Sequence, residues 1–177
     1  MLVLCNFIGG LGAGALSSQR LTRGITRLLR LKDRLRLYGF IELLVTAGVL
    51  LTIVARNIPA DIWGPFPYQL QNGIFFPSLE FELFQLVTAI ICVFVPCYFM
   101  GVTFPLLCHT FAKHDRFPST LYGWNTLGAC SGVLACHFLF LPLLGYDLMF
   151  LSLATANGLL GAFFLLTGET YKTTLSP

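Results

Sequence analysis

The sequence predicts an all-α fold, a polytopic membrane helix bundle with about five transmembrane helices and a basic amphipathic helix at the membrane interface. Hydrophobic residues make up 56% of the 177 residues, and charged residues only 11%. A typical soluble domain carries about 25% charged residues. The mean hydropathy of +0.78 agrees with this class. The apolar residues also fall into runs that are long enough to cross a bilayer, so we expect a single transmembrane domain over residues 1–177.

Five apolar stretches are the predicted membrane spans, and they cover residues 2–16, 37–55, 83–107, 121–143 and 148–168. The first stretch is short, and a signal peptide is the competing interpretation. It lacks the basic segment that precedes the apolar part of a signal peptide, and dense positive charge follows it instead. We therefore interpret it as a span.

The placement of charge predicts the orientation. Lys and Arg gather between Arg20 and Arg36 and again in the loop 108–120, whereas the loop 56–82 carries more acidic residues. Basic loops mark the cytoplasmic side of a membrane protein. We expect a multi-pass protein of a bacterial inner membrane, with its N-terminus outside and its C-terminus in the cytoplasm.

The basic segment 18–36 has helical order. Five arginines step by three or four residues and share one helix face, with leucines on the other: Arg20, Arg23, Arg27, Arg30 and Arg34. This pattern predicts an interfacial helix that binds anionic lipid headgroups. An ordinary positive-inside loop is the alternative, and it stays open. Nucleic acid is not an expected partner, because the segment lacks the aromatic residues on which bases stack.

The outer loop 56–82 is rich in aromatic and proline residues, among them Trp63, Phe66 and Phe76. Aromatic rings at headgroup level are common membrane anchors. We favour anchoring for this loop over docking of a partner subunit.

Among the polar side chains inside the predicted spans, we single out four as candidates: Glu42, Asn125, His137 and Asn157. Ionisable groups at membrane depth are functional candidates by default. For Glu42 we favour a structural role, in which it pairs with the nearby arginines or is protonated. His137 is the candidate cofactor ligand, for a haem or a pigment metal, with packing or hydrogen bonding as the alternative. The two asparagines are expected to form hydrogen bonds between helices.

Glycines mark the expected helix contacts. The stretch "IGGLGAG" at residues 8–14 resembles a glycine-rich dinucleotide-binding loop, but the sequence around it does not alternate between strands and helices. Small residues four apart instead let two membrane helices approach closely. We expect the first span to pack on the fourth through Gly10, Gly14, Gly128 and Gly132, and Gly158 and Gly161 give the fifth span another small face.

Distinctive motifs occur in four segments, "LRLYGFIELLVTAGVLL", "VPCYFMGVTFPLL", "LYGWNTLGACSGVLACHFLFLPLLGYD" and "ATANGLLGAFFLL". Together they resemble the membrane domain of spermidine synthase-like proteins, bacterial relatives of polyamine aminopropyltransferases in which a transporter-like half is fused to a synthase. The resemblance runs from about Gly10 to Leu166. The matching residues are Tyr38, Glu42, Pro96, Met100, Gly101, Pro105, Leu106, Tyr122, Asn125, Thr126, Gly128, Ala129, Gly132, Pro142, Gly145 and Asn157.

The chain also departs from that family. It begins where a second family helix is expected, His137 stands where a glycine is usual, and no soluble aminopropyltransferase domain follows Gly168. We therefore expect no catalytic residues, no metal site and no enzymatic activity from this chain alone. It is expected to bind no cofactor by itself, and a pigment, quinone or haem shared with neighbouring subunits stays open.

The function expected from the sequence is that of an accessory or scaffolding subunit in a larger membrane complex. Its partners are then the lipid bilayer, anionic lipids and other membrane protein subunits. The alternative is a transporter-like half, or a membrane anchor, that works with a separate aminopropyltransferase chain in polyamine metabolism.

Overall fold

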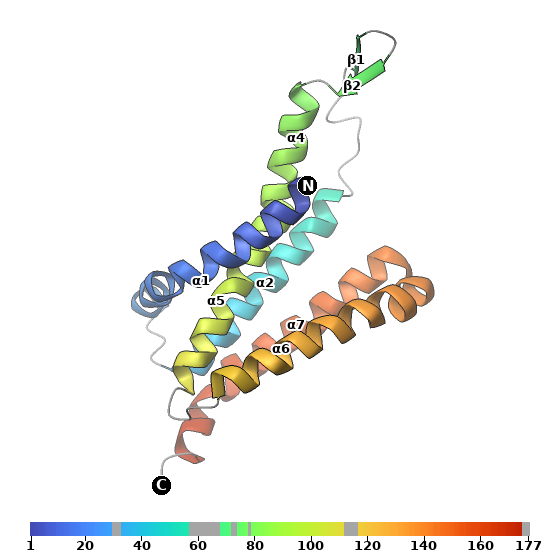
Figure 1. The fold of residues 1–177 in the computed structure, drawn as a ribbon. Helices are drawn as coiled ribbons and strands as arrows, with labels where there is room; N and C mark the ends of the chain where they lie inside the picture. Colours follow the sequence, from blue (N-terminus) through green and yellow to red (C-terminus); the bar gives the residue numbers. More distant parts are fainter. Residues whose placement is uncertain (30–32, 57–67, 72–73, 78, 112–116, 175–177) are drawn as a thin grey trace.

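The computed structural model describes residues 1–29, 33–56, 68–71, 74–77, 79–111 and 117–174. Apart from one short β-hairpin, the described elements are helices (Figure 1). In chain order they are α1 (Leu2–Leu29), α2 (Arg34–Arg56), β1 (Tyr68–Gln71), β2 (Ile74–Pro77), α4 (Leu79–Ala89), the π-helix η1 (Ile90–Phe94), α5 (Val95–Thr110), α6 (Phe117–Ala135), the π-helix η2 (Cys136–Phe140) and α7 (Leu141–Thr174).

Four helical segments in the described part of the chain are long and apolar enough to cross a membrane: Leu2–Leu29, Arg34–Val54, Gln85–Thr110 and Pro118–Gly168. The all-helical fold expected from the sequence is thus confirmed, with helices that could cross a membrane, but the five expected spans fall in four helical segments rather than five. The reason is that the predicted fourth and fifth spans belong to one continuous helical segment of 51 residues. Within that segment the backbone leaves helical geometry at Gly145, whose φ is 70° and ψ is 179°.

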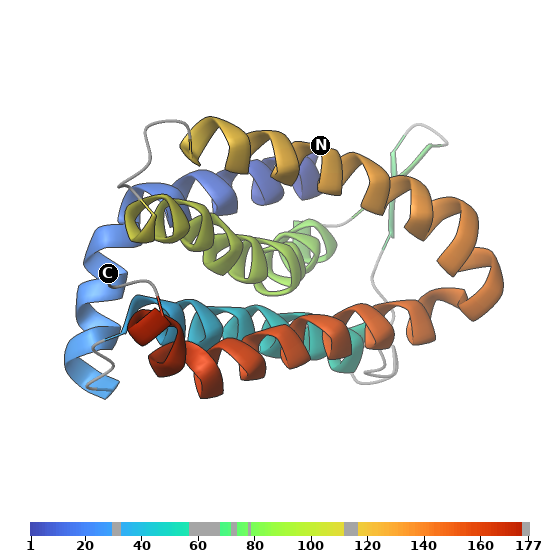
Figure 2. The same cartoon turned by 90° about the horizontal axis from the view of Figure 1, so that it is seen from below.

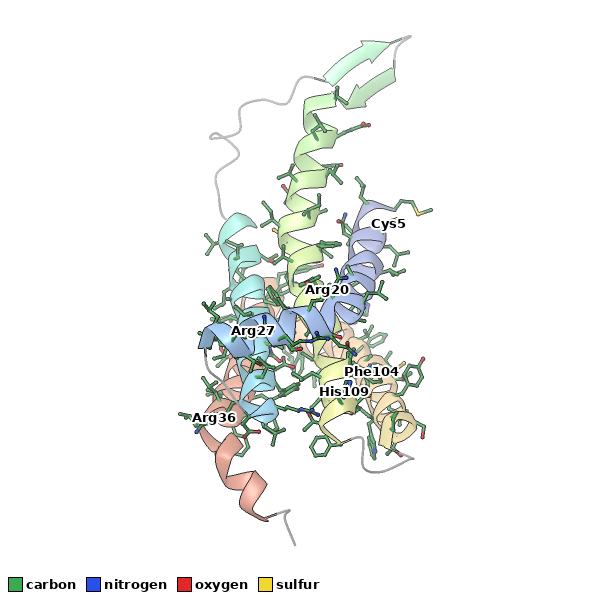
Figure 3. The ribbon with its side chains drawn as sticks, turned by 90° about the vertical axis from the view of Figure 1, so that its left-hand side faces the viewer. Cys5, Arg20, Arg27, Arg36, Phe104 and His109 are labelled. Atoms are coloured by element: carbon green, nitrogen blue, oxygen red, sulfur yellow. The ribbon has the colours of Figure 1, made fainter. Side chains whose placement is uncertain are left out.

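The basic segment is not a separate helix over residues 18–36. Residues up to Leu29 continue α1, and α2 begins at Arg34. Figure 3 shows that α1 changes direction near Arg20, so that its second half runs across the bundle. Just before this point, the Ser17 hydroxyl lies 2.6 Å from the carbonyl oxygen of Ala13. Hydrogen bonds of this kind, from a serine to its own helix, often bend helices.

Glycines allow the closest helix contacts. At Gly14 of α1 an added Cβ would collide with the Tyr98 carbonyl of α5, and Gly101 of α5 meets the backbone of Leu11 in the same way. On the other side of the bundle, a Cβ on Gly161 of α7 would lie 2.9 Å from the carbonyl oxygen of Gly39 in α2. The bundle is therefore built from two helix pairs, α1 with α5 and α2 with α7, which join where α2 packs on α5.

A small apolar core holds these two pairs together. Ile41 of α2 and Val102 of α5 have no solvent-exposed surface. Leu37 and Leu106 complete the buried cluster, and Leu21 and Ile25 of α1 pack against it. The apolar face of the basic segment thus packs in part on protein rather than on lipid.

Each π-helix precedes a proline. Proline lacks an N–H and its ring clashes with the carbonyl four residues earlier. For Pro96 that residue is Cys92 in η1, and for Pro142 it is Phe138 in η2. The Thr52 hydroxyl of α2 donates a hydrogen bond of 3.1 Å to the Cys92 carbonyl oxygen. The Cys92 carbonyl oxygen thus has a hydrogen-bond partner on a neighbouring helix, as a low-dielectric environment would require.

The predicted fifth span lies in α7, which runs back along the bundle. Figure 2 shows α6 along one side of the molecule and α7 along the opposite side, joined at one end. α7 packs along α2, whereas α6 makes few contacts with the rest of the bundle, chiefly with α5. The C-terminal end of α7, the N-terminal end of α2 and the C-terminal end of α5 lie at the same end of the molecule (Figure 1).

The predicted outer loop contains a short antiparallel hairpin, in which Tyr68 pairs with Pro77 and Gln71 with Ile74. The expected aromatic anchors Trp63 and Phe66 lie outside the described residues.

Candidate functional site

The candidate site is a cavity of about 590 Å³ in the middle of the helix bundle. Helices α1, α2, α5, α6 and α7 all contribute to its wall. Between α5 and α6 it is bordered by Phe104 and Tyr122, whose rings meet edge to face with their centroids 6.4 Å apart. Most of the lining is apolar, but a few polar side chains project from different helices, which is the usual composition of a small-molecule site.

Glu42 is the only acidic residue among the described residues that line this cavity. Only 8% of its surface is exposed. Tyr38, one helical turn earlier on α2, lines the same cavity, so the two side chains share one face of that helix. The pairing of Glu42 with the arginines of the basic segment stays a prediction.

Asn157 of α7 reaches into the same region. Its amide nitrogen donates to the Glu42 backbone carbonyl oxygen at 3.1 Å and to the Thr46 hydroxyl at 3.2 Å. These bonds tie α7 to α2 at the level of Glu42. Asn125 of α6 lines the cavity from the other side. Three of the four polar residues singled out in the sequence therefore lie around one cavity.

This arrangement is suited to binding a small cation. A buried carboxylate attracts positive charge strongly, because the low-dielectric surroundings screen it little. The amide oxygens and tyrosine hydroxyl groups accept hydrogen bonds from an ammonium group. Aromatic rings such as those of Phe104 and Tyr122 attract cations over their faces.

His137, the fourth polar residue, lies elsewhere. It is exposed in η2, and its ring packs edge to face on Phe138 with the centroids 4.9 Å apart. It lines a second cavity of about 370 Å³, between α6 and the start of α7, together with Tyr146 and Met149. The described residues contain no group of three or more His, Cys, Asp or Glu side chains placed to hold a metal ion.

The glycines of α6 line that second cavity. At Gly128 and Gly132 an added Cβ would meet no described atom within 4 Å. The expected contact of this pair with Gly10 and Gly14 does not form, because the glycines of α1 pack on α5 instead. Gly158 of α7 faces the Thr46 side chain of α2, at 3.3 Å from an added Cβ.

The predicted headgroup arginines separate into two groups. Arg23, Arg27 and Arg34 line one groove, which lies below the second half of α1. Arg20 is exposed outside that groove, and Arg30 lies outside the described residues.

Two residues that line the candidate sites, Tyr38 and His109, were not predicted as site residues from the sequence. Tyr38 stands four residues before Glu42, and this i, i+4 spacing was a usable signal, because it places both side chains on one helix face. His109, at the end of α5, carried no such signal, because only the packing of α5 against α1 and α2 brings it to the arginine groove.

The chain was also compared with known proteins. No protein-family model, characterised protein or solved structure matches it.

Proposed function

We propose that this chain is a multi-pass membrane subunit that accepts a helix of a partner subunit against the glycine face of α6. One contrast carries the proposal. Gly10, Gly14, Gly39 and Gly161 are packed against other helices of this chain, whereas Gly128 and Gly132, which stand four residues apart and line the second cavity, would meet no described atom through an added Cβ.

Small residues are useful in membrane helices because they let another backbone come close. A glycine facing lipid gives up that contact and also lowers helix stability by about 1 kcal/mol relative to alanine. A partner helix packed on Gly128 and Gly132 offsets this cost. The second cavity, between these glycines and Tyr146 and Met149 of α7, provides the space that such a helix enters.

The test compares two leucine substitutions on opposite faces of α6. Gly132→Leu fills the proposed contact, and we expect it to weaken the complex isolated in mild detergent by about 5- to 150-fold, the effect of 1–3 kcal/mol of overpacking. Cys130→Leu is the matched control, because position 130 is two residues away and points about 200° from the glycine face. The size of the assembly is measured by native mass spectrometry.

The isolated chain should melt at about the same temperature with either substitution, because an added Cβ at Gly132 meets no described atom and Cys130 is exposed. Equal assembly of the two variants would contradict a partner on the glycine face.

The cavity around Glu42 supports a second candidate function, a transporter-like half that binds an organic cation. Binding sites of transporters lie near the bilayer midplane, where polar groups of several helices converge. Glu42, Asn125 and Asn157 converge in this way from α2, α6 and α7. Under this proposal the chain works beside a separate aminopropyltransferase in polyamine metabolism, as the resemblance to spermidine synthase-like proteins implies.

Putrescine is the probe for this second candidate. It should raise the melting temperature of the purified chain, and its uncharged analogue 1,4-butanediol should not. Glu42→Gln keeps the shape of the side chain and removes the charge, so it should abolish the shift. A shift that survives in Glu42→Gln would rule out the cavity as the cation site.

We also propose that α6 and α7 each cross the bilayer, so that the four helical segments make five passes. In this arrangement the N-terminus is outside and the C-terminus is in the cytoplasm of a bacterial inner membrane. The support is the distribution of Lys and Arg along the sequence and the placement of the ends of α2, α5 and α7 at one end of the molecule (Figure 1).

A further inference from the structure

A basic groove of about 500 Å³ lies where α1 crosses the beginning of α2 and the end of α5. Arg23 and Arg27 enter it from α1 and Arg34 from α2. Figure 3 shows Arg27 on the crossing half of α1, with His109 below it at the end of α5. The groove shares only Pro105 with the lining described for the cavity around Glu42, and none of the residues described as lining the groove is acidic.

The arginines in this groove retain free hydrogen-bond donors. Arg34 uses one N–H for the His109 carbonyl oxygen, at 2.6 Å. Arg23 makes a long bond of 3.4 Å to the Gln19 side chain. A guanidinium group has five N–H donors, and within the described part of the chain none of the three arginines forms an ion pair with a carboxylate. Hydroxyl groups of Thr22 and Thr26 line the same groove.

We propose that this groove binds a phosphate group, with Arg23, Arg27 and Arg34 as its ligands. Several like charges that converge without an acidic partner repel one another, and an anion between them removes that repulsion. Phosphate fits three guanidinium groups better than a single carboxylate does, because it offers more acceptor oxygens.

The surroundings favour a phosphate carried by a lipid. The groove lies at helix ends, because Arg34 begins α2 and His109 stands one residue from the end of α5. The ends of transmembrane helices lie at headgroup level, and basic pockets between helices at this depth bind anionic headgroups. Leu37 and Leu106 form an apolar floor beside the arginines. A soluble phosphate or diphosphate presents the same chemistry to the arginines.

The experiment uses the full chain in nanodiscs of phosphatidylcholine, with and without phosphatidylglycerol. Bound phosphatidylglycerol is counted by native mass spectrometry, and the melting temperature is recorded in parallel. A separate arm adds inorganic pyrophosphate to the phosphatidylcholine nanodiscs. We expect Arg27→Gln to weaken binding about tenfold or more, the usual effect of losing a charge-assisted hydrogen bond.

Arg20→Gln is the matched control. It removes the same charge from the same helix, but position 20 lies outside the groove. Phosphatidylglycerol binding that is lost in Arg27→Gln and kept in Arg20→Gln supports a lipid phosphate. The same pattern with pyrophosphate alone supports a soluble one. Equal losses in the two variants would overturn the proposal, because attraction to the positive surface charge as a whole does not distinguish the two positions. The absence of binding of either probe would overturn it as well.

Discussion

Replacing Gly14 with leucine should separate α1 from α5 and destabilise the whole bundle. An added Cβ at this position collides with the backbone carbonyl of Tyr98, and the Cα of Gly101 lies 3.1 Å away. Backbone atoms cannot rotate out of the way as side chains can. We therefore expect a loss at the upper end of the usual overpacking range, about 3 kcal/mol, and a fall in melting temperature of about 6–12 °C.

The control for this prediction lies two residues away on the same helix. At Gly12 an added Cβ meets no described atom within 4 Å, so Gly12→Leu should leave the melting temperature unchanged or raise it slightly, since leucine favours helix more than glycine does. Thermal unfolding of the purified chain in detergent compares the two variants. Similar losses at both positions would mean that α1 does not pack on α5 through Gly14.

A second large effect is expected at Gly145, near the start of α7, where the backbone leaves helical geometry. Its φ of 70° and ψ of 179° lie in a region that is essentially restricted to glycine. The substitution Gly145→Ala should therefore cost about 1–3 kcal/mol through the backbone alone, because no described atom lies near the added Cβ.

The substitution Gly123→Ala should instead raise the stability of the chain. Gly123 lies in the interior of α6, and its added Cβ also meets no described atom. Alanine there should stabilise the helix by about 0.4–1 kcal/mol. Thermal unfolding of the two variants should thus shift in opposite directions. A Gly145→Ala chain that melts at or above the wild-type temperature would contradict the non-helical backbone geometry at this glycine.

Helices long and apolar enough to cross a membrane could be predicted from the sequence, because this property is local. Apolar run length and the scarcity of charge are sufficient to indicate helices that could cross a bilayer. The ends of the helices were harder to predict from the sequence. The sequence showed a short first span and a separate basic helix, whereas α1 continues through both, because Leu21 and Ile25 gain contacts with the core around Ile41 and Val102.

The pairing of glycines could not be predicted from spacing. Any helix with a small residue at a matching position along its axis could pack on Gly10 and Gly14. In the structure that residue is Gly101 of α5, and not Gly128 or Gly132 of α6. The grouping of the polar residues could not be predicted from the sequence either. The sequence marked Glu42, Asn125 and Asn157 one by one, but only the packing of α2, α6 and α7 places them around one cavity.

The most direct test of the account concerns the segment Pro118–Gly168, because the cavity, the glycine face and the number of passes all depend on its folding back. Single cysteines are placed at Ser119, Asp147 and Lys172 in a chain whose six native cysteines are replaced. They are then labelled in sealed membranes with an impermeant maleimide. We predict that cysteines at positions 119 and 172 react from one side and the cysteine at position 147 from the other. Reaction of positions 119 and 172 from opposite sides would show that the segment crosses the membrane an odd number of times, and would contradict the α6–α7 hairpin.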